Sequence, residues 1–441
     1  MSAPRPSALS DHAAAVLRAN DRGGYTVPSP GLYPFQWNWD SAFTALGWAC
    51  LDEERAWREL HSLLAAQWRD GMVPHIVFRE PNGDYFPGPE VWGTAASPPT
   101  SGISQPPVAA SIARMLVERA RDAELAERAC RPLLPHLYRW HRWYHHQRDP
   151  RGEGLVFVVH PWESGMDNSP AFDEPLEAVP ARSTGSRARR DLRHVRAAER
   201  PTDRDYDRYL YLVEWFRERG YRPEAVAESP FLVADLAVNF ILLRADRDLL
   251  WLGRRLEASL PEEEIAAWIV RSEAALRQLR DPRTGFYHPL DGRRGRPIGV
   301  RTHAAFLALW AELGDARLLA QLEGWIAKTR FALSSVEADD PRFEPRRYWR
   351  GPVWPVINFL IAEGAARAGA PELASRLRED LHRLVERSGF REYFDPRDGR
   401  GLGGERFAWT AAIWLWWIGP GAERRRTVAP APLPGPNTLN G

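Results

Sequence analysis

Three segments of the sequence that are rich in aromatic residues and glycine each carry carboxylate side chains. The segments are YPFQWNWD, which ends at Asp40, HPWESGMDNS, which contains Glu163 and Asp167, and GLGGERF, which contains Glu405. Hydrolysis of a glycosidic bond uses two carboxyl groups, one protonated to donate to the leaving oxygen and one ionised to act on water or on the sugar. Asp167 and Glu405 are candidates for this pair. They lie far apart in the sequence, so only a closed fold could bring them together.

Each of these carboxylates also has a structural interpretation. Asp40 precedes a predicted helix and could cap it, whereas Asp167 could form a turn with the two residues that follow it. Glu405 precedes another predicted helix, whose N-terminal dipole favours an acid, and Glu163 could be a buried hydrogen-bonding partner. The recurrence of the same residue types in three segments favours chemistry over coincidence.

Tryptophan is unusually frequent, with 20 copies in the chain. Many of them lie in polar segments punctuated by Gly and Pro, where flat aromatic faces could line a cleft for a sugar ring. Tryptophans on predicted helices, such as Trp57, Trp140 and Trp268, are expected in the core instead.

Helical periodicity dominates the chain. Helices are predicted at residues 41–51, 53–69, 107–121, 123–147, 204–219, 231–258, 261–279, 302–313, 316–329, 353–368, 371–388 and 408–417. A single strand is predicted, at residues 155–159.

Long loops recur after roughly every second predicted helix. They span residues 25–40, 71–105, 152–200, 281–301, 334–352 and 389–405. Loops of this length are usually functional. Helical hairpins with long loops at one end predict an all-α fold, an (α/α)6 barrel whose long loops converge on one mouth. We expect one catalytic domain over residues 1–429 and a disordered Pro- and Gly-rich tail at residues 430–441.

The charge balance excludes several classes of protein. The chain has 441 residues, with 59 Lys and Arg against 58 Asp and Glu, a formal charge of +1. This balance argues against a nucleic-acid partner. No apolar run is long enough to span a membrane, and the start has no apolar signal-peptide core. We therefore expect a cytoplasmic enzyme with no membrane partner, and the sequence leaves the formation of a homo-oligomer open.

The same composition limits the cofactors. Lys328 is the only lysine in the sequence, so a phosphate-binding loop of the Walker type is absent and a Schiff-base lysine is improbable. Two cysteines are too few for a cysteine zinc site, and no histidine or carboxylate cluster shows metal-ligand spacing. We expect no metal and no organic cofactor.

Three motifs resemble those of the family 63 glycoside hydrolases, which are related to trehalases. The motifs are WNWDSAF at residues 37–43, WESGMDNS at residues 162–169 and YWRGPVWP at residues 348–355. The resemblance runs from about Tyr33 to Trp417 and is greatest to the short, single-domain members, the bacterial mannosylglycerate and glucosylglycerate hydrolases. It implies an (α/α)6 barrel and hydrolysis with inversion, for which two carboxyl groups stand about 6.5–9.5 Å apart with water between them.

The resemblance also implies roles for individual residues. It makes Asp167 the general acid and Glu405 the general base. Sugar binding is implied for Tyr33, Trp37, Trp39, Asp40, Gln105, Tyr348, Trp349 and Trp354. The sequence departs from trehalases at Gln36 and Met166, so trehalose is a less expected substrate.

The aglycone can be argued from an arginine-rich segment at residues 182–211. The planar fork of an arginine suits a carboxylate such as that of glycerate, and a tyrosine can add a hydroxyl donor. We hypothesise that Arg200 and Tyr206 hold the glycerate, although a solvated basic loop explains the same pattern. His75 and Tyr85, in another long loop, are further candidates for contact with the substrate.

The leading hypothesis is thus an inverting α-glycosidase, a compatible-solute hydrolase that cleaves mannosylglycerate or glucosylglycerate. Another α-glucosidase or trehalase-like hydrolase is an alternative. A sugar epimerase or isomerase on the same fold is a second, and it would need His75, His160 or His303 paired across the mouth. A sugar-binding barrel without turnover is a third.

Overall fold

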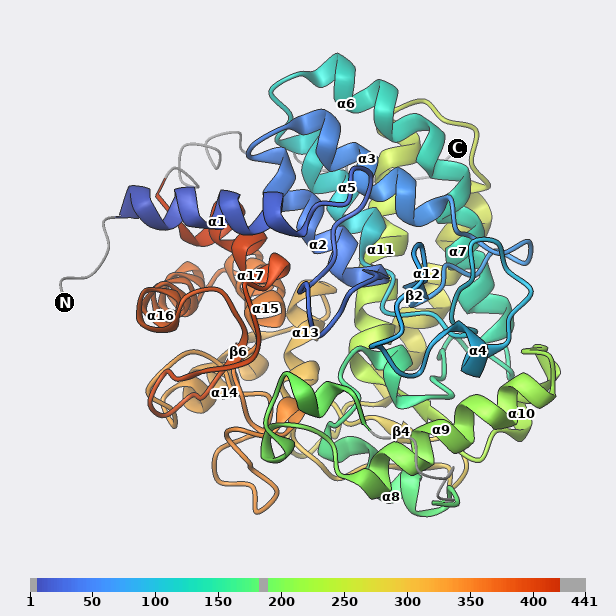
Figure 1. Ribbon diagram of the computed structural model, residues 1–441. Coiled ribbons are helices and arrows are strands. Elements are labelled where there is room, and N and C mark those ends of the chain that lie inside the picture. Colours follow the sequence, from blue (N-terminus) through green and yellow to red (C-terminus); the bar gives the residue numbers. More distant parts are fainter. Residues whose placement is uncertain (1–5, 182–188, 421–441) are drawn as a thin grey trace, which may run out of the picture.

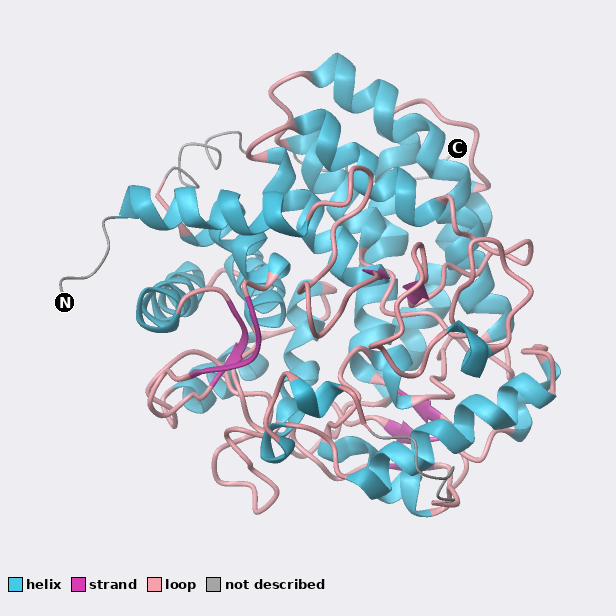
Figure 2. Ribbon diagram, viewed as in Figure 1, coloured by secondary structure: helices cyan, strands magenta, loops and turns pink. Residues whose placement is uncertain are grey.

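The computed structural model describes residues 6–181 and 189–420. The predicted tail at residues 430–441 lies outside the described residues, as do Arg182 and Arg187 of the arginine-rich segment. Helices make up most of the described chain, and the few strands are short (Figure 2).

Six helices form a closed inner ring, in which each helix contacts the next and the last returns to the first. The ring consists of α2 (Asn38–Ala49), α5 (Ala109–Glu118), α11 (Leu236–Arg255), α13 (Leu307–Trp310), α15 (Pro355–Arg367) and α17 (Ala408–Ile413). Figure 1 shows these helices in the middle of the molecule, with others around them. The ring closes where Gly47 of α2 meets α17. A Cβ atom on Gly47 would lie 2.5 Å from Ala412 Cα, so only glycine allows the two helices to approach this closely.

An outer layer of helices packs on this ring, mostly as partners of the preceding inner helix. It comprises α1 (Pro6–Asn20), α3 (Glu53–Leu64), α6 (Ala123–Cys130), α7 (Leu134–Gln147), α12 (Glu262–Gln278), α14 (Ala316–Ile326) and α16 (Pro371–Ser388). Helices α3, α12 and α16 pack on α2, α11 and α15, and α1 packs on α17. The arrangement confirms the predicted all-α (α/α)6 barrel.

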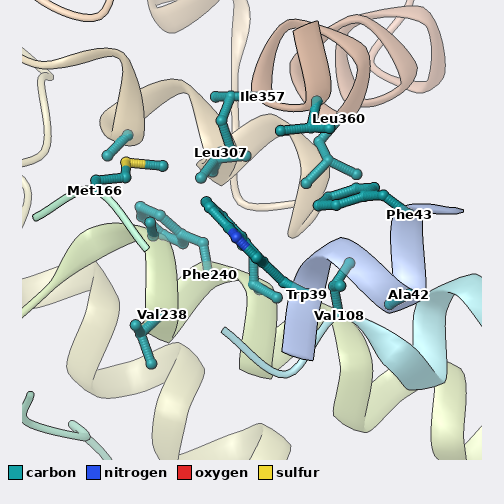
Figure 3. Packing of buried hydrophobic residues seen from close by; sticks show 14 of the residues in the cluster. Trp39, Ala42, Phe43, Val108, Met166, Val238, Phe240, Leu307, Ile357 and Leu360 are labelled. Atoms are coloured by element: carbon teal, nitrogen blue, oxygen red, sulfur yellow. The ribbon is translucent and has the colours of Figure 1, made fainter. Parts of the chain in front are cut away.

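The two layers differ in sequence for a physical reason. Helix α15 is buried on nearly every side and is apolar almost throughout, whereas α16 buries a single stripe that includes Leu377, Leu381 and Leu384. An inner helix is surrounded by protein and an outer helix faces water on one side. The centre of the ring is filled by side chains from several inner helices, among them Trp39, Phe240, Leu307 and Leu360 (Figure 3).

Some predicted elements have different boundaries in the structure. The predicted helix at 123–147 is two helices, α6 and α7, joined by a 3-10 turn that contains Pro132. The predicted helix at 302–313 begins as a 3-10 turn and leaves only the four residues of α13. The short helices α4 (Pro89–Trp92), α8 (Asp173–Glu177) and α10 (Glu224–Glu228) lie in segments for which no helix was predicted, as does the whole of α1. Helix α9 (Asp203–Glu218) agrees with its prediction.

The predicted strand at 155–159 is wrong, because this segment forms an isolated bridge between Val158 and Val233 and no regular strand. The strands are antiparallel and lie in predicted loops or at helix ends. They are β1 (Gln36–Trp37) paired with β2 (Ile76–Val77), the set β3 (Val233–Ala234), β4 (Leu290–Asp291) and β5 (Arg296–Pro297), and the hairpin of β6 (Arg391–Phe394) with β7 (Gly401–Glu405). Within the described residues, no helix combines the length and apolar character needed to cross a membrane.

Candidate active site

A cavity of about 80 Å³ lies where the long loops of the barrel meet. Five of the six predicted long loops contribute to its wall, and the segment at 281–301 does not. Of the residues predicted from the sequence, the wall contains Asp167, Tyr33, Trp37, Trp39, Asp40, His75, Tyr85, Gln105, Arg200, Tyr206 and Tyr348. Five of the six predicted loops therefore converge on one mouth.

Asp167 follows a 3-10 turn (Pro161–Ser164) and a glycine in the left-handed region. That glycine, Gly165, has φ +69°, and a Cβ atom on it would lie 2.6 Å from the Trp39 ring, so the turn that presents Asp167 requires glycine. The backbone carbonyl of Asp167 accepts a 2.5 Å hydrogen bond from the Tyr209 hydroxyl. Burial raises the pKa of the Asp167 carboxyl to about 6, although the positive charge of Arg200 opposes the shift.

A second buried carboxylate in the wall is Glu392, on β6. One carboxyl oxygen accepts a hydrogen bond of 3.0 Å from the Tyr33 hydroxyl, and the other accepts one of 2.9 Å from the backbone N–H of Gly404. Only 1% of Glu392 is exposed. Burial raises its pKa to about 7, against the lowering effect of Arg200. Glu392 thus has both oxygens oriented by donors from two different elements.

Arg200 lies between the aromatic wall and the carboxylates. Its Nη1 donates to the Tyr33 hydroxyl oxygen at 2.8 Å, and its Nε donates to Asp191 at 3.3 Å. The guanidinium also lies over the Tyr348 ring, 4.1 Å from the ring centre. Since the single proton of Tyr33 goes to Glu392, the Tyr348 hydroxyl, 3.0 Å from that of Tyr33, is the donor between the two tyrosines. The result is a continuous hydrogen-bonded chain from Arg200 to Glu392.

Asp40 is a third buried carboxylate of the wall, in the first turn of α2. Trp37, and not Asp40, occupies the N-cap position, so the capping interpretation of Asp40 is wrong. Other aspartates of the chain, such as Asp52 and Asp235, do cap helices. Burial, together with the negative charge of Glu392, raises the pKa of Asp40 well above its usual value. A protonated Asp40 can donate a hydrogen bond to a ligand hydroxyl.

The arrangement suits acid–base hydrolysis of a ligand that carries a negative charge. Two buried carboxyl groups titrate near neutral pH, so one can hold a proton while the other is ionised. A buried arginine supplies a donor fork for an anion. Tryptophan and tyrosine rings form much of the remaining wall.

Comparison with known proteins identifies the family. The model of the mannosylglycerate hydrolase MGH1-like glycoside hydrolase domain matches residues 33–410. The chain belongs to this family. It is 52% identical over 413 residues to a mannosylglycerate hydrolase of Thermus thermophilus, covering 92% of this chain and 99% of the relative. It is 36% identical to a glucosylglycerate hydrolase of Mycolicibacterium hassiacum, covering 94% and 98% of the two chains.

A solved structure supports the same assignment. The crystal structure of a GH63 mannosylglycerate hydrolase from Thermus thermophilus in complex with Tris and D-glycerate superimposes with a TM-score of 0.89 at 51% identity. The match covers 93% of this chain and 99% of the other. The resemblance to family 63 that the sequence motifs indicated is therefore confirmed, and the chain is a glycoside hydrolase.

In this glycoside hydrolase, the expectation for Glu405 does not fit the structure. Glu405 is the last residue of β7, its side chain is 72% exposed, and it forms a 2.9 Å ion pair with Arg391. Glu405 pairs with Arg391 across the hairpin, and directly opposed residues of antiparallel strands point to the same face. Glu392, the next residue along β6, lies at a register shift between Arg391 and Tyr393, and its side chain reaches the cavity wall. The register of the hairpin thus turns Glu405 towards solvent.

Trp349 and Trp354 were predicted to bind sugar, but neither is part of the cavity wall within the described chain. Their rings stack with centres 3.5 Å apart and an angle of 3° between the planes. Trp354 also stacks on Tyr393, which neighbours Glu392. Both tryptophans are fully buried. They support Tyr348 and β6 from the core side.

The other predicted aromatic and polar residues form the wall through contacts with one another. Trp37 packs edge to face against Tyr33 and Tyr85. The Gln105 side chain accepts a long hydrogen bond from the Trp39 backbone at 3.4 Å. The Tyr206 hydroxyl donates to a backbone carbonyl at 3.1 Å, so its one proton is already engaged.

Of the three histidines that an isomerase would pair across the mouth, only His75 lies in the cavity wall. The His75 ring shares a hydrogen bond with Ser101, and burial lowers its pKa well below the usual value. His160 is held between the Tyr209 carbonyl and a backbone N–H, and burial lowers its pKa to about 3. His303 is also buried, with its pKa lowered to about 3. The described residues contain no group of three or more His, Cys, Asp or Glu side chains placed to hold a metal ion.

Among the wall residues that the analysis of the sequence missed, Glu392 and Asp191 belong to the hydrogen-bonded network of Arg200. Glu392 lies in a segment assigned to a loop, although its neighbours Tyr393 and Phe394 have strand propensity that could have revealed β6. Asp191 lies among arginines and gave no separate signal. Glu163, by contrast, forms a 2.6 Å ion pair with Arg148 in the interior, in agreement with its structural interpretation.

Proposed function

We propose that this glycoside hydrolase cleaves an α-glycoside of glycerate, mannosylglycerate or glucosylglycerate, to hexose and glycerate with inversion at the anomeric carbon. The observation that carries the proposal is the presence of Asp167, Glu392 and Arg200 in the wall of a single buried cavity. The names of the relatives support both sugars, and the solved relative with bound D-glycerate supports the aglycone.

In the proposed mechanism, Asp167 donates its proton to the glycosidic oxygen as the bond from that oxygen to the anomeric carbon breaks. Glu392 accepts a proton from the water that attacks the anomeric carbon from the opposite side. The donors Tyr33 and Gly404 orient Glu392 for this step. Glu392 therefore takes the role of general base that the resemblance had given to Glu405.

The two carboxyl groups titrate as a pair that shares one proton near neutral pH. The charge of Asp167 contributes to the raised pKa of Glu392, so the two protonation steps are coupled. The productive form is the singly protonated one with its proton on Asp167. Because the pKa of Glu392 is the higher of the two, this is the less populated of the two singly protonated forms in the free enzyme. Activity should therefore follow a bell-shaped dependence on pH.

Arg200 is the proposed anchor of the glycerate carboxylate. Asp191 and Tyr33 engage its Nε and Nη1, which leaves other N–H groups of the guanidinium for an incoming anion. Tyr206 lies in the same part of the wall, and its hydroxyl oxygen can accept a hydrogen bond from the substrate. The cytoplasmic location and the role in compatible-solute metabolism stay predictions, and the oligomeric state stays open.

A proton NMR time course tests the proposal. Purified protein is mixed with mannosylglycerate, glucosylglycerate and trehalose, and the anomer of the released hexose is recorded. We expect the β-anomer first, from a glycerate glycoside, and no release by Asp167→Asn or Glu392→Gln. Initial appearance of the α-anomer would contradict inversion, and consumption of trehalose alone would contradict the glycerate assignment.

A separate substrate distinguishes the acid from the base. An α-glycosyl fluoride has a leaving group that needs no protonation, so Asp167→Asn should still hydrolyse it whereas Glu392→Gln should not. The opposite pattern would exchange the two roles.

A further inference from the structure

Asp191 is a carboxylate of the cavity wall that the proposed mechanism does not use. It begins a short 3-10 turn (Asp191–Arg193), and its side chain is 10% exposed. Two arginines bind it: Arg189 through two N–H groups, at 3.2 and 2.6 Å, and Arg200 through Nε at 3.3 Å. Although burial alone would raise its pKa, Arg200 and Arg189 hold the pKa of Asp191 below its ordinary value. Asp191 is therefore ionised at neutral pH.

These three residues form a buried cluster with an unbalanced charge. Two guanidinium groups and one carboxylate give a net charge of +1, and the side chains of Arg189, Asp191 and Arg200 are each 10% exposed or less. Arg189 also contacts Asp203, which is 86% exposed and therefore strongly screened by water. The charge of Glu392 also acts on Arg200, but Glu392 is linked to the guanidinium through the Tyr33 hydroxyl and lies outside this three-residue cluster.

Asp191 and the substrate would share one guanidinium. A carboxylate bound to the remaining N–H groups of Arg200 would lie on the same planar fork as Asp191, and two anions held this closely in a buried site repel each other. One additional negative charge brings the cluster to neutrality. A second would leave an uncompensated buried anion next to Asp191, which is costly.

We propose that Asp191 sets the charge of the aglycone that this enzyme accepts at one negative charge. The inference rests on the proposed function, in which the aglycone carboxylate binds Arg200. A neutral aglycone leaves the cluster with a net charge of +1. A monoanion brings the net charge to zero, and a dianion brings it to −1. Asp191 is thus a specificity-determining residue that excludes glycosides with more highly charged aglycones from the site.

A series of three substrates with one carbon skeleton tests this inference. The substrates are α-glycosides attached through the central hydroxyl of glycerol, glycerate and tartronate, whose aglycones carry zero, one and two negative charges. The quantity measured is kcat/KM for each substrate at pH 7, with the sugar that the wild-type enzyme prefers. For the wild type we expect the glycerate glycoside to exceed both others by at least about tenfold, since 1.4 kcal/mol corresponds to a factor of ten.

Asp191→Asn should shift the preferred aglycone charge from one negative charge towards two. The asparagine carbonyl oxygen can still accept hydrogen bonds from the arginines, but the cluster then carries a charge of +2. The ratio of kcat/KM for the tartronate glycoside to that for the glycerate glycoside should rise by about tenfold or more. Asp203→Asn is the matched control, because Asp203 also contacts Arg189 but lies outside the cavity wall. It should retain the wild-type order.

The outcomes separate this inference from the proposed function. Hydrolysis of none of the three glycosides by the wild type would overturn both. Hydrolysis of the glycerate glycoside with an unchanged order of substrates in Asp191→Asn, or the same change in Asp203→Asn, would overturn the role of Asp191 alone. If Asp191→Asn fails to fold, inhibition of the wild type by the free acids decides. Tartronate should then inhibit at least about tenfold more weakly than glycerate, and equal inhibition would refute the inference.

Discussion

The hairpin β6–β7 carries two glutamates with opposite surroundings. Glu392 on β6 is 1% exposed and has its pKa raised to about 7, whereas the Glu405 side chain on β7 is 72% exposed and pairs with Arg391. A register shift separates Arg391 from Tyr393 on β6, and the same short hairpin places an acid–base group in the cavity wall and a solvated ion pair on its outer side. The environment of a carboxylate in this barrel depends on strand register more than on the local motif.

The largest expected effect comes from removing each glutamate in turn. Glu392→Gln should lower kcat for the glycerate glycoside by about 10²–10⁴-fold, the usual contribution of a general base. Glu405→Gln should stay within about twofold, because an exposed ion pair contributes little. Steady-state kinetics on both variants measures the difference, with circular dichroism as the check on folding. A large loss in Glu405→Gln with an active Glu392→Gln would reverse the assignment.

The same comparison shows what could be predicted from sequence. The inner helices were found because helices such as α15 are apolar and periodic over their whole length, and the ring follows from helical pairs with long loops at one end. Asp167 was found because WESGMDNS is a distinctive loop motif. These features depend on residues close together in the sequence, so they could be predicted without the structure.

Three-dimensional information was needed to identify Glu392 and Asp191 as cavity-wall residues and to place Trp349 in the core. Glu392 lies on a four-residue strand with a register shift between Arg391 and Tyr393, too short for a clear alternation. Trp349 belongs to the YWRGPVWP motif, yet its ring stacks against Trp354 within the core. Burial and register arise from tertiary packing, so residue type alone could not separate ligand contacts from supporting contacts.

A smaller loss of kcat is expected when an added side-chain atom on β7 displaces the Glu392 carboxyl group. Gly403 has φ +65°, and a Cβ atom on it would lie 2.4 Å from a Glu392 carboxyl oxygen. Gly403→Ala should lower kcat by roughly 10–100-fold, since small displacements of a reacting group are costly. Gly389 also has a positive φ, +72°, but nothing lies within 4 Å of an added Cβ atom, so Gly389→Ala introduces backbone strain without the clash. It should lose about 1 kcal/mol of stability and keep its kcat. Equal kcat values for the two variants would contradict the proposed placement of the base.

The pH dependence of kcat/KM should also distinguish the two glutamates, because only Glu392 is expected to contribute to it. The wild type should show limbs near pH 6 and 7, from the coupled pair of Asp167 and Glu392, and lose about tenfold per pH unit beyond them. Glu405→Gln should leave both limbs in place. Because Arg200 lowers the pKa of both carboxyl groups, Arg200→Gln should shift both limbs to higher pH. A shift to lower pH would contradict the assigned charges.

The smallest expected effect concerns stability. The folded-state pKa of Glu392, about 7, lies above the value of 4.5 expected for an unfolded chain, so the folded protein binds more protons between these values. By linkage, its contribution to stability is complete below about pH 4.5 and is lost as the pH rises through 7.

Glu392→Gln removes the cost of an ionised buried carboxylate and should raise the free energy of unfolding at pH 8 by roughly 1–3 kcal/mol, with little gain at pH 4.5. Glu405→Gln, on the solvated face, should change it by less than about 0.5 kcal/mol at either pH. Urea unfolding at the two pH values measures both, and a Glu392→Gln variant less stable than the wild type at pH 8 would show that the hydrogen bonds from Tyr33 and Gly404 outweigh the burial of the charge.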